Sequence, residues 1–155
     1  MVPSDLVPLV EHLVTRFRPQ AEKNGVTLHF SKPFASLPPI HVDPQRIEQI
    51  LSNLISNALR YTPAGGQIGI NLSSQPHQAS VQIHDSGPGI PEESMALVFE
   101  RFYRADKGRS RAEGGSGLGL AIARQLARAH GGELSAANHP QGGAVFTLSL
   151  PVARR

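Results

Sequence analysis

The sequence predicts an α+β fold, a two-layer α/β sandwich in which about three helices cover one face of a mixed sheet. Three long stretches carry apolar residues at helical spacing or open with helix-start signals. Five shorter stretches are predicted as strands, three of them from strict alternation of apolar and polar residues. Helices and strands are interspersed along the chain, and this order favours a sandwich built around one sheet.

The first predicted helix covers residues 4–23, where six apolar residues repeat at helical spacing. Pro8 and Pro19 are expected to limit it at its two ends, because proline disrupts a helix interior. Residues 26–31 alternate between apolar and polar and are predicted as a strand. The proline-rich residues 36–40 are expected to be irregular.

The second predicted helix begins at Asp43 and Pro44, because aspartate caps helix N-termini and proline suits the first helical position. It runs to about Tyr61. Residues 67–73 and 79–85 alternate with period two, so we predict two strands joined as a hairpin.

Residues 86–117 are predicted to form a long segment with one short helical piece, residues 92–99. The third long helix covers residues 118–130 and is closed by two glycines. Strands over residues 133–138 and 144–150 complete the sheet. With 155 residues, of which 39% are hydrophobic, we expect a single domain over residues 1–155, with tails at 1–5 and 152–155.

Composition excludes several classes of protein. The chain has no cysteine, which excludes disulfides, thiol nucleophiles and cysteine-ligated metals. No apolar run approaches the roughly 20 residues that cross a bilayer, and the N-terminus lacks signal-peptide features. Aromatic residues make up only 5% of the chain, which argues against a nucleic-acid partner. The basic residues cluster once, at Arg101, Arg104, Lys107, Arg109 and Arg111, and this cluster would suit a nucleotide phosphate chain.

Two asparagines lie beside the apolar stripe of the second helix, together with Arg46 and Arg60. Asn53 and Asn57 are one turn apart, although asparagine is a poor residue inside a helix. Two explanations remain open. The carboxamides either bridge neighbouring loops or supply an oxygen ligand to a hard cation such as Mg²⁺.

Two further motifs are rich in glycine. Asp85 ends a strand and is followed by Gly87 and Gly89, which indicates either an ordinary turn or the close approach of a ligand. The stretch 114–120 opens the third helix, where free backbone N–H groups can bind phosphate. A flexible linker would explain its first glycines but not Gly119, which is costly inside a helix.

Together these motifs resemble the catalytic and ATP-binding domain of two-component sensor histidine kinases. That domain belongs to the GHKL superfamily, shared with type II topoisomerases, Hsp90 and MutL. The resemblance covers residues 6–151 and includes four sequence boxes in the family's order. Asn53 to Ala58 with Tyr61 resembles the N box, Asp85 to Gly89 the G1 box, Phe99 to Arg104 the F box, and Gly115 to Leu120 the G2 box. It implies a Bergerat ATP-binding fold with a mobile lid over about residues 99–117.

The resemblance also implies residue roles and ligands, ATP and Mg²⁺. Asn57 would be the metal ligand, and with Asn53 beside it would form the catalytic pair on the phosphate side. Asp85 would accept a hydrogen bond from the adenine amino group, while Gly87 and Gly89 would let the backbone pass the base. The remaining nucleotide contacts would be a stacking ring, phosphate-binding cations and the hinge of the lid: Tyr61, Arg60, Arg104, Gly115, Gly117, Leu118 and Gly119.

Two departures from the family pattern bear on activity. Where the superfamily's ATP hydrolases have a glutamate general base, this sequence has Asn53, which favours a kinase acting on histidine. Ala144 stands where relatives often have threonine. None of the seven histidines suits the acceptor, so we expect that residue on a separate dimerisation domain upstream.

The function implied by the resemblance is transfer of the γ-phosphoryl group of ATP to that histidine, with a response regulator downstream. We expect a cytoplasmic domain of a membrane-anchored bacterial kinase that does not itself contact the membrane. A GHKL-type ATPase and a non-catalytic nucleotide-binding regulatory module are the alternatives.

Overall fold

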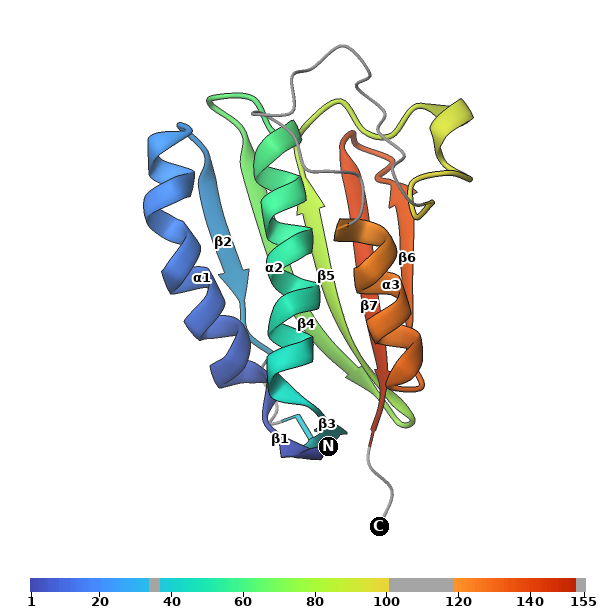
Figure 1. Cartoon of the computed structure of the whole chain (residues 1–155). Helices are drawn as coiled ribbons and strands as arrows, with labels where there is room; N and C mark the ends of the chain where they lie inside the picture. Colours follow the sequence, from blue (N-terminus) through green and yellow to red (C-terminus); the bar gives the residue numbers. More distant parts are fainter. Residues whose placement is uncertain (34–36, 101–118, 153–155) are drawn as a thin grey trace.

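The computed structural model describes residues 1–33, 37–100 and 119–152, which form two layers (Figure 1). Three helices make one layer: α1 (Leu6–Lys23), α2 (Pro44–Tyr61) and α3 (Gly119–Ala129). They lie side by side on one face of a five-stranded sheet. The predicted two-layer sandwich is therefore confirmed.

The sheet is mixed, as predicted. Its strands are β2 (Thr27–Ser31), β4 (Gln67–Gln75), β5 (Gln78–Asp85), β7 (Ala144–Pro151) and β6 (Glu133–Asn138), in the spatial order β2-β4-β5-β7-β6. β2 and β4 are parallel, and every other neighbouring pair is antiparallel. β7 returns beside β5, and β6 lies on the far side of β7, so residues about 60 positions apart in the sequence, such as His84 and Val145, meet at the carboxyl end of β5.

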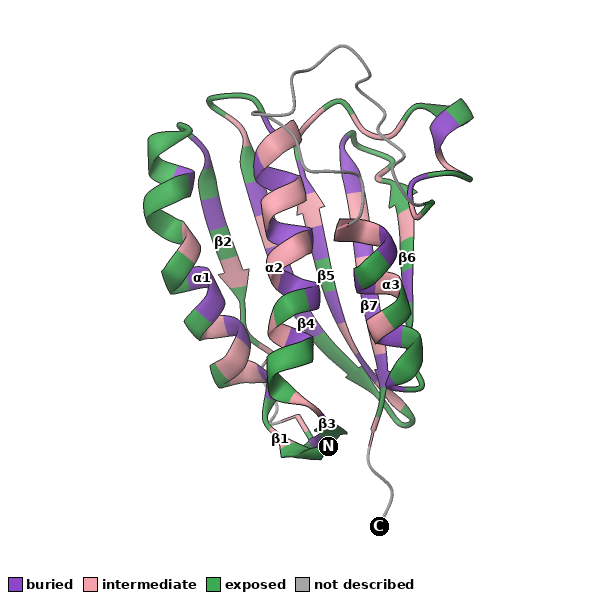
Figure 2. Ribbon diagram, viewed as in Figure 1, coloured by how far each residue is buried: buried purple, intermediate pink, exposed green. Residues whose placement is uncertain are grey.

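The core lies between the sheet and the helices (Figure 2). Alternate residues of each strand point to the helices, and those of β4 and β5 are almost wholly buried. The facing stripe of α2 is continuous and buried along the whole helix: Ile47, Ile50, Leu51, Leu54, Ile55, Ala58 and Leu59. α2 follows the predicted start, because Asp43 accepts a hydrogen bond from the Gln45 N–H at 3.0 Å.

The N-terminal residues differ from the prediction. Val2–Ser4 form strand β1, which pairs antiparallel with β3 (Ile40–Val42), so residues 1–5 are not a tail. Such short strands, one of which contains Pro3, carry no periodic signal. α1 begins after Asp5 and continues through Pro19, which does not end it.

Pro19 is tolerated because it lies on the exposed side of α1. The residue one turn earlier, Thr15, is also exposed, so water can bond its carbonyl in place of the missing N–H. The helix predicted over residues 92–99 is shorter than expected. It is a 3-10 helix, Glu92–Ser94, followed by turns whose bonds join residues three apart, such as Leu97 N–H to Ser94 O at 2.9 Å.

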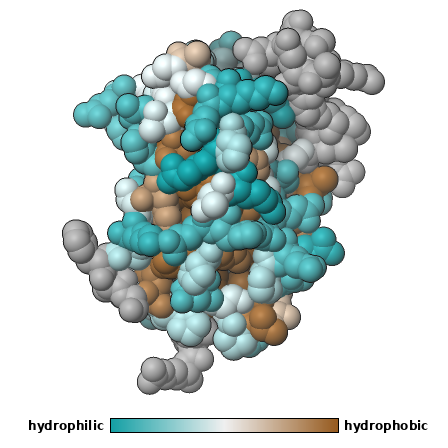
Figure 3. Space-filling view, turned by 90° about the vertical axis from the view of Figure 1, so that its left-hand side faces the viewer, coloured by the Kyte–Doolittle hydropathy of each residue, from teal (hydrophilic) through white to brown (hydrophobic). Residues whose placement is uncertain are grey.

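The carboxyl end of β5, the C-terminus of α2 and the N-terminus of α3 all lie toward the same end of the molecule (Figure 1). Viewed from the α1 side, the surface is mainly hydrophilic, and apolar side chains are visible only in patches among the polar ones (Figure 3). In the described parts of the chain, no helix is both long and apolar enough to span a membrane.

Candidate functional site

Asp85 occupies a core position of the sheet. The buried residues of β5 alternate as Ala79, Val81 and Ile83, and Asp85 is the next in the series. Its carboxylate therefore lies on the helix side, and the residue is only 4% exposed. A charged group at an apolar position of this alternation is unusual, since aspartate is rarely buried without a partner.

The Asp85 carboxylate is held by backbone donors. Oδ1 accepts hydrogen bonds from the Gly87 N–H at 2.9 Å and from the Ala144 N–H at 3.4 Å. Burial raises the pKa of Asp85 above its usual value, because desolvation disfavours the charged form, and the two backbone bonds oppose this only partly. Among the described residues, Oδ2 has no hydrogen-bond partner, so this oxygen is available to a ligand.

Glycines around Asp85 allow very close backbone contacts. A Cβ added to Gly87 would lie 2.5 Å from the Tyr61 carbonyl oxygen. Gly143, in the turn between β6 and β7, has a φ of +85°, and a Cβ there would lie 1.8 Å from the Asp85 carbonyl oxygen. No larger residue fits at either position without moving the backbone.

The two asparagines of α2 have different surroundings. The Asn53 side chain donates a hydrogen bond from Nδ2 to the Gly119 carbonyl at 3.1 Å, so it bridges α2 to the first residue of α3. Asn57 is half-buried, and its carboxamide has no hydrogen-bond partner in the described part of the chain. Of the two explanations left open by the sequence, bridging applies to Asn53.

The arginines predicted beside these asparagines lie apart from one another. Arg60 follows Asn57 closely, and its guanidinium lies 5.9 Å from the centre of the Tyr61 ring. Arg46 is an exposed residue in the first turn of α2, bonded to Gln49 at 3.3 Å. Because it is 11 residues before Asn57, about 16 Å along the helix axis, Arg46 does not belong to this cluster.

The structure thus brings together eight predicted residues at one end of the sheet: Asn53, Asn57, Arg60, Tyr61, Asp85, Gly87, Gly89 and Gly119. Four predicted residues lie outside the described residues, namely Arg104, Gly115, Gly117 and Leu118, as does the lid over residues 101–117. Two residues that the sequence did not single out also contact this cluster: Gly143, through the contact above, and Asn138. Asn138 bonds both polar backbone groups of Ile90, at 2.7 and 2.8 Å.

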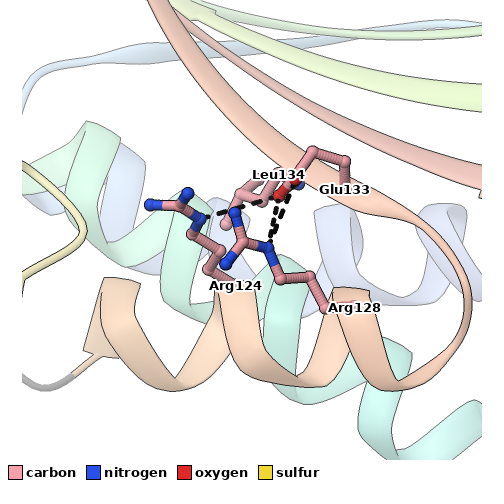
Figure 4. A network of polar contacts seen from close by, with 4 residues as sticks. All are labelled: Arg124, Arg128, Glu133 and Leu134. Carbon is pink, nitrogen blue, oxygen red and sulfur yellow. Dashed lines mark hydrogen bonds and ion pairs between the residues drawn. The ribbon is translucent and has the colours of Figure 1, made fainter. Parts of the chain in front are cut away.

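Contacts of Arg124 and Arg128 connect α3 to Phe99, near the end of the described range 37–100, and to β6. The Phe99 ring packs edge-on against Phe146, and the Arg124 guanidinium lies 5.1 Å from the Phe99 centroid. Figure 4 shows Arg124 and Arg128 converging on Glu133 of β6, with Nε to Oε1 distances of 3.6 and 3.2 Å. The hydrogen bond from Arg128 lowers the pKa of Glu133. This network connects the predicted F-box phenylalanine to both layers.

A buried aspartate at a strand end, glycines that admit close backbone approach and a helix carboxamide with no partner among the described residues define a nucleotide-binding domain of the sandwich type. The family model described as "Histidine kinase-, DNA gyrase B-, and HSP90-like ATPase" matches residues 42–154. The chain belongs to this family, which confirms the resemblance seen in the sequence.

Its relatives are sensor histidine kinases. The chain is 40% identical over 152 residues to the signal transduction histidine-protein kinase BaeS of Escherichia coli. This match covers 98% of this chain and 32% of BaeS. It is 49% identical over 110 residues to AfsQ2 of Streptomyces coelicolor, covering 71% of this chain and 20% of the relative. The chain therefore spans about a third or less of these curated relatives.

Solved structures of histidine kinases have the same fold. The mycobacterial sensor histidine kinase MprB superposes with a TM-score of 0.80 at 31% identity, covering 96% of this chain and 97% of the other. Full-length ShkA in complex with AMPPNP gives a TM-score of 0.86 at 30% identity over 99% of this chain and 31% of the other. ThkA in complex with the response regulator TrrA gives 0.80 at 28% identity, covering 96% and 41%.

Proposed function

We propose that this chain binds Mg-ATP and transfers the γ-phosphoryl group to a histidine on a separate phosphoacceptor domain. The observation that carries the proposal is Asp85, a carboxylate buried at a core position, with one oxygen bonded to backbone N–H groups and the other without a partner among the described residues. Membership of the histidine-kinase-like ATPase family and the AMPPNP complex of ShkA support a nucleotide as the ligand.

Asp85 recognises adenine in this proposal. The free carboxylate oxygen accepts a hydrogen bond from the exocyclic amino group, and guanine presents a carbonyl oxygen at that position. Gly87 and Gly89 bring the backbone past the base, because a side chain at either position would collide with its neighbours. Tyr61, at the end of α2, lies against Gly87 through its carbonyl and contributes its ring beside the base.

Asn57 holds the metal in this proposal. Its carboxamide oxygen is a hard ligand of the kind that Mg²⁺ accepts, and it has no competing partner among the described residues. Within the same residues, no group of three or more acidic or histidine side chains could hold a metal. Asn57 would hold the cation together with the ATP phosphates and water, and the group would supply neutralisation of phosphate charge when bound. Arg60 adds a positive charge from the last turn of α2.

Catalysis consists mainly of positioning and charge neutralisation. Asn53 supplies no general base, and its Nδ2 is occupied by the Gly119 carbonyl. A water molecule beside Asn53 would therefore not be activated for attack on the γ-phosphate. A histidine acceptor needs less help, since its imidazole is largely neutral near pH 7 and already nucleophilic. The attacking nitrogen bonds the γ-phosphorus while the bond to the ADP oxygen breaks.

The proposal extends to the whole protein. Residues 1–155 would form the nucleotide-binding domain, and the acceptor histidine and sensing regions would belong to other domains of a membrane-anchored kinase, with this domain in the cytoplasm. The relatives are named as signal transduction histidine-protein kinases and are at least about three times as long as this chain, which supports the presence of further domains. The complex of ThkA with TrrA supports a response regulator as the downstream partner.

The test mixes the chain with the dimerisation and phosphoacceptor domain of a relative and γ-labelled ATP. We expect label on the acceptor domain that is lost in acid and stable in alkali, as for phosphohistidine. A matched acceptor domain with its histidine replaced by glutamine should stay unlabelled. Steady release of phosphate without any acceptor would instead support an ATPase. Nucleotide binding without transfer to any acceptor tested would support a regulatory module.

A further inference from the structure

Asn138, the last residue of β6, makes an unusual contact with the loop after Asp85. Its Oδ1 accepts a hydrogen bond from the Ile90 N–H at 2.7 Å, and its Nδ2 donates one to the Ile90 carbonyl at 2.8 Å. A single carboxamide thus satisfies both backbone groups of one residue. Two hydrogen bonds to one residue restrict both the position and the orientation of that backbone segment.

The glycine before Ile90 is adapted to this contact. Gly89 has a φ of +83°, and a Cβ built there would lie 2.8 Å from Asn138 Oδ1. The positive φ favours glycine here, and a Cβ would also push the Asn138 carboxamide away from the loop. Gly89 therefore preserves the contact with Asn138, whereas Gly87 is required by the Tyr61 carbonyl oxygen, a backbone atom that cannot move aside cheaply.

Asn138 and Asp85 share a neighbour. Asn138 pairs with Ala144 across the β6–β7 ladder, and the Ala144 N–H bonds Asp85. The first residue of β7 thus lies between the two side chains. Asp85 holds the beginning of the loop to β7, and Asn138 holds its end to β6. The loop of residues 86–90 is fixed at both ends to adjacent strands.

The side chain of Asn138 contributes little to the core. The residue is exposed, and the buried residue of this strand is Leu134. Both polar atoms of this exposed side chain are bonded to the loop. Asn138 therefore fixes the position of the loop more than it stabilises the sheet. A strand residue chosen only for stability would more often be β-branched or aromatic.

We propose that Asn138 is a positioning residue for base selection. It holds residues 86–90 in the conformation that places Asp85 and the loop backbone around adenine, and it does not touch the nucleotide itself. The inference rests on the proposed function, because it assumes that adenine binds at Asp85. It adds a residue of β6, outside the aspartate-glycine motif, that determines the selectivity of the site.

The test measures the affinity of Asn138→Ala for ADP and GDP by calorimetry, without metal, alongside thermal unfolding. We expect ADP to bind about 5- to 30-fold more weakly, the loss of two modest hydrogen bonds that order the loop. The ratio of ADP to GDP affinity should fall, because the loop no longer favours adenine. Asn138→Asp keeps the acceptor for the Ile90 N–H, so its affinity should lie between those of the alanine variant and the parent.

Asn71→Ala is the matched control, an exposed asparagine of β4 with no contact to this loop. It should bind ADP as the parent does. If Asn138→Ala binds ADP as tightly as the parent, the inference about Asn138 is wrong, but the proposed function is unaffected. An equal loss for ADP and GDP with a lower unfolding temperature would also overturn it, because that result means a structural role. If the parent binds neither nucleotide, the proposed function itself fails.

Discussion

The sandwich core and the loop after Asp85 are held by different forces. The face of α2 and the sheet beneath it are joined by apolar side chains such as Ile47, Leu54 and Ile68, each 0% exposed. The loop of residues 86–90 has few buried side chains and is fixed by hydrogen bonds and by backbone contacts at glycine. Apolar burial is non-directional and tolerates small shifts, whereas each polar contact specifies one partner. Stability and ligand geometry are therefore separable in this molecule.

The largest effect on stability is expected in the core. Leu54→Ala removes a fully buried side chain between α2 and the sheet, which should lower the free energy of unfolding by about 2–5 kcal/mol. Gln49→Ala, on the exposed side of the same helix, should change it by no more than about 0.5 kcal/mol. Urea unfolding of both variants checks this, and similar losses would show that α2 is not held by its apolar face.

Two adjacent glycines separate backbone strain from close contact. Gly142 and Gly143 both have positive φ, at +105° and +85°, so alanine is strained at either position. A Cβ at Gly142 meets nothing within 4 Å, whereas at Gly143 it meets the Asp85 carbonyl. Gly143→Ala should therefore cost about 1–3 kcal/mol more than Gly142→Ala and should weaken ADP binding, which Gly142→Ala should leave nearly unchanged. Equal behaviour of the two variants would contradict this contact.

We expect Asp85 to lower the free energy of unfolding as the pH rises, because its carboxyl group then ionises in a buried position. Its pKa is raised in the folded state above the usual 3.8, so the folded chain binds the proton more tightly than the unfolded chain. The contribution is favourable below pH 3.8 and is lost as the pH rises through the raised value. Asp85→Asn should gain stability relative to the parent over that interval. Urea unfolding at a series of pH values checks this, and a difference independent of pH would contradict it.

The smallest effect is expected at Glu133. Glu133→Gln removes the ion pairs with Arg124 and Arg128, but these side chains are between 36% and 52% exposed to solvent, so the loss should be about 0.5 kcal/mol or less. The pKa of Glu133 is lowered in the folded state, so its contribution is present above its usual 4.5 and is lost as the pH falls through the lowered value. Thermal unfolding with and without added salt checks this. A loss comparable to that of Leu54→Ala would mean that the network, not the core, holds α3.

The same division explains how far the sequence predicted the structure. α2 and β6 have the expected bounds, because a cap and a long periodic pattern are local signals. β1 and β3 were missed because each is only three residues long, too short for a periodic pattern, although Ile40 and Val42 of β3 are buried in the core. Asp85, Gly87 and Asn57 lie in local motifs and could be named from the sequence.

Asn138 and Gly143 could not be named in this way. Asn138 is bonded to a residue 48 positions away, and Gly143 is tight against a strand that is its neighbour only in space. No spacing in the sequence reports such contacts. One signal was available for Asp85 beyond its motif, because the apolar alternation of β5 places a carboxylate at a core position.

The most direct test of the central claim is a calorimetric titration of the parent and Asp85→Asn with ATP. The claim is that adenine is bound by the free oxygen of this buried carboxylate. Loss of one charge-assisted hydrogen bond should weaken binding about 10- to 150-fold, while the variant stays folded and at least as stable as the parent at neutral pH. Equal affinity of the two proteins for ATP would contradict the account.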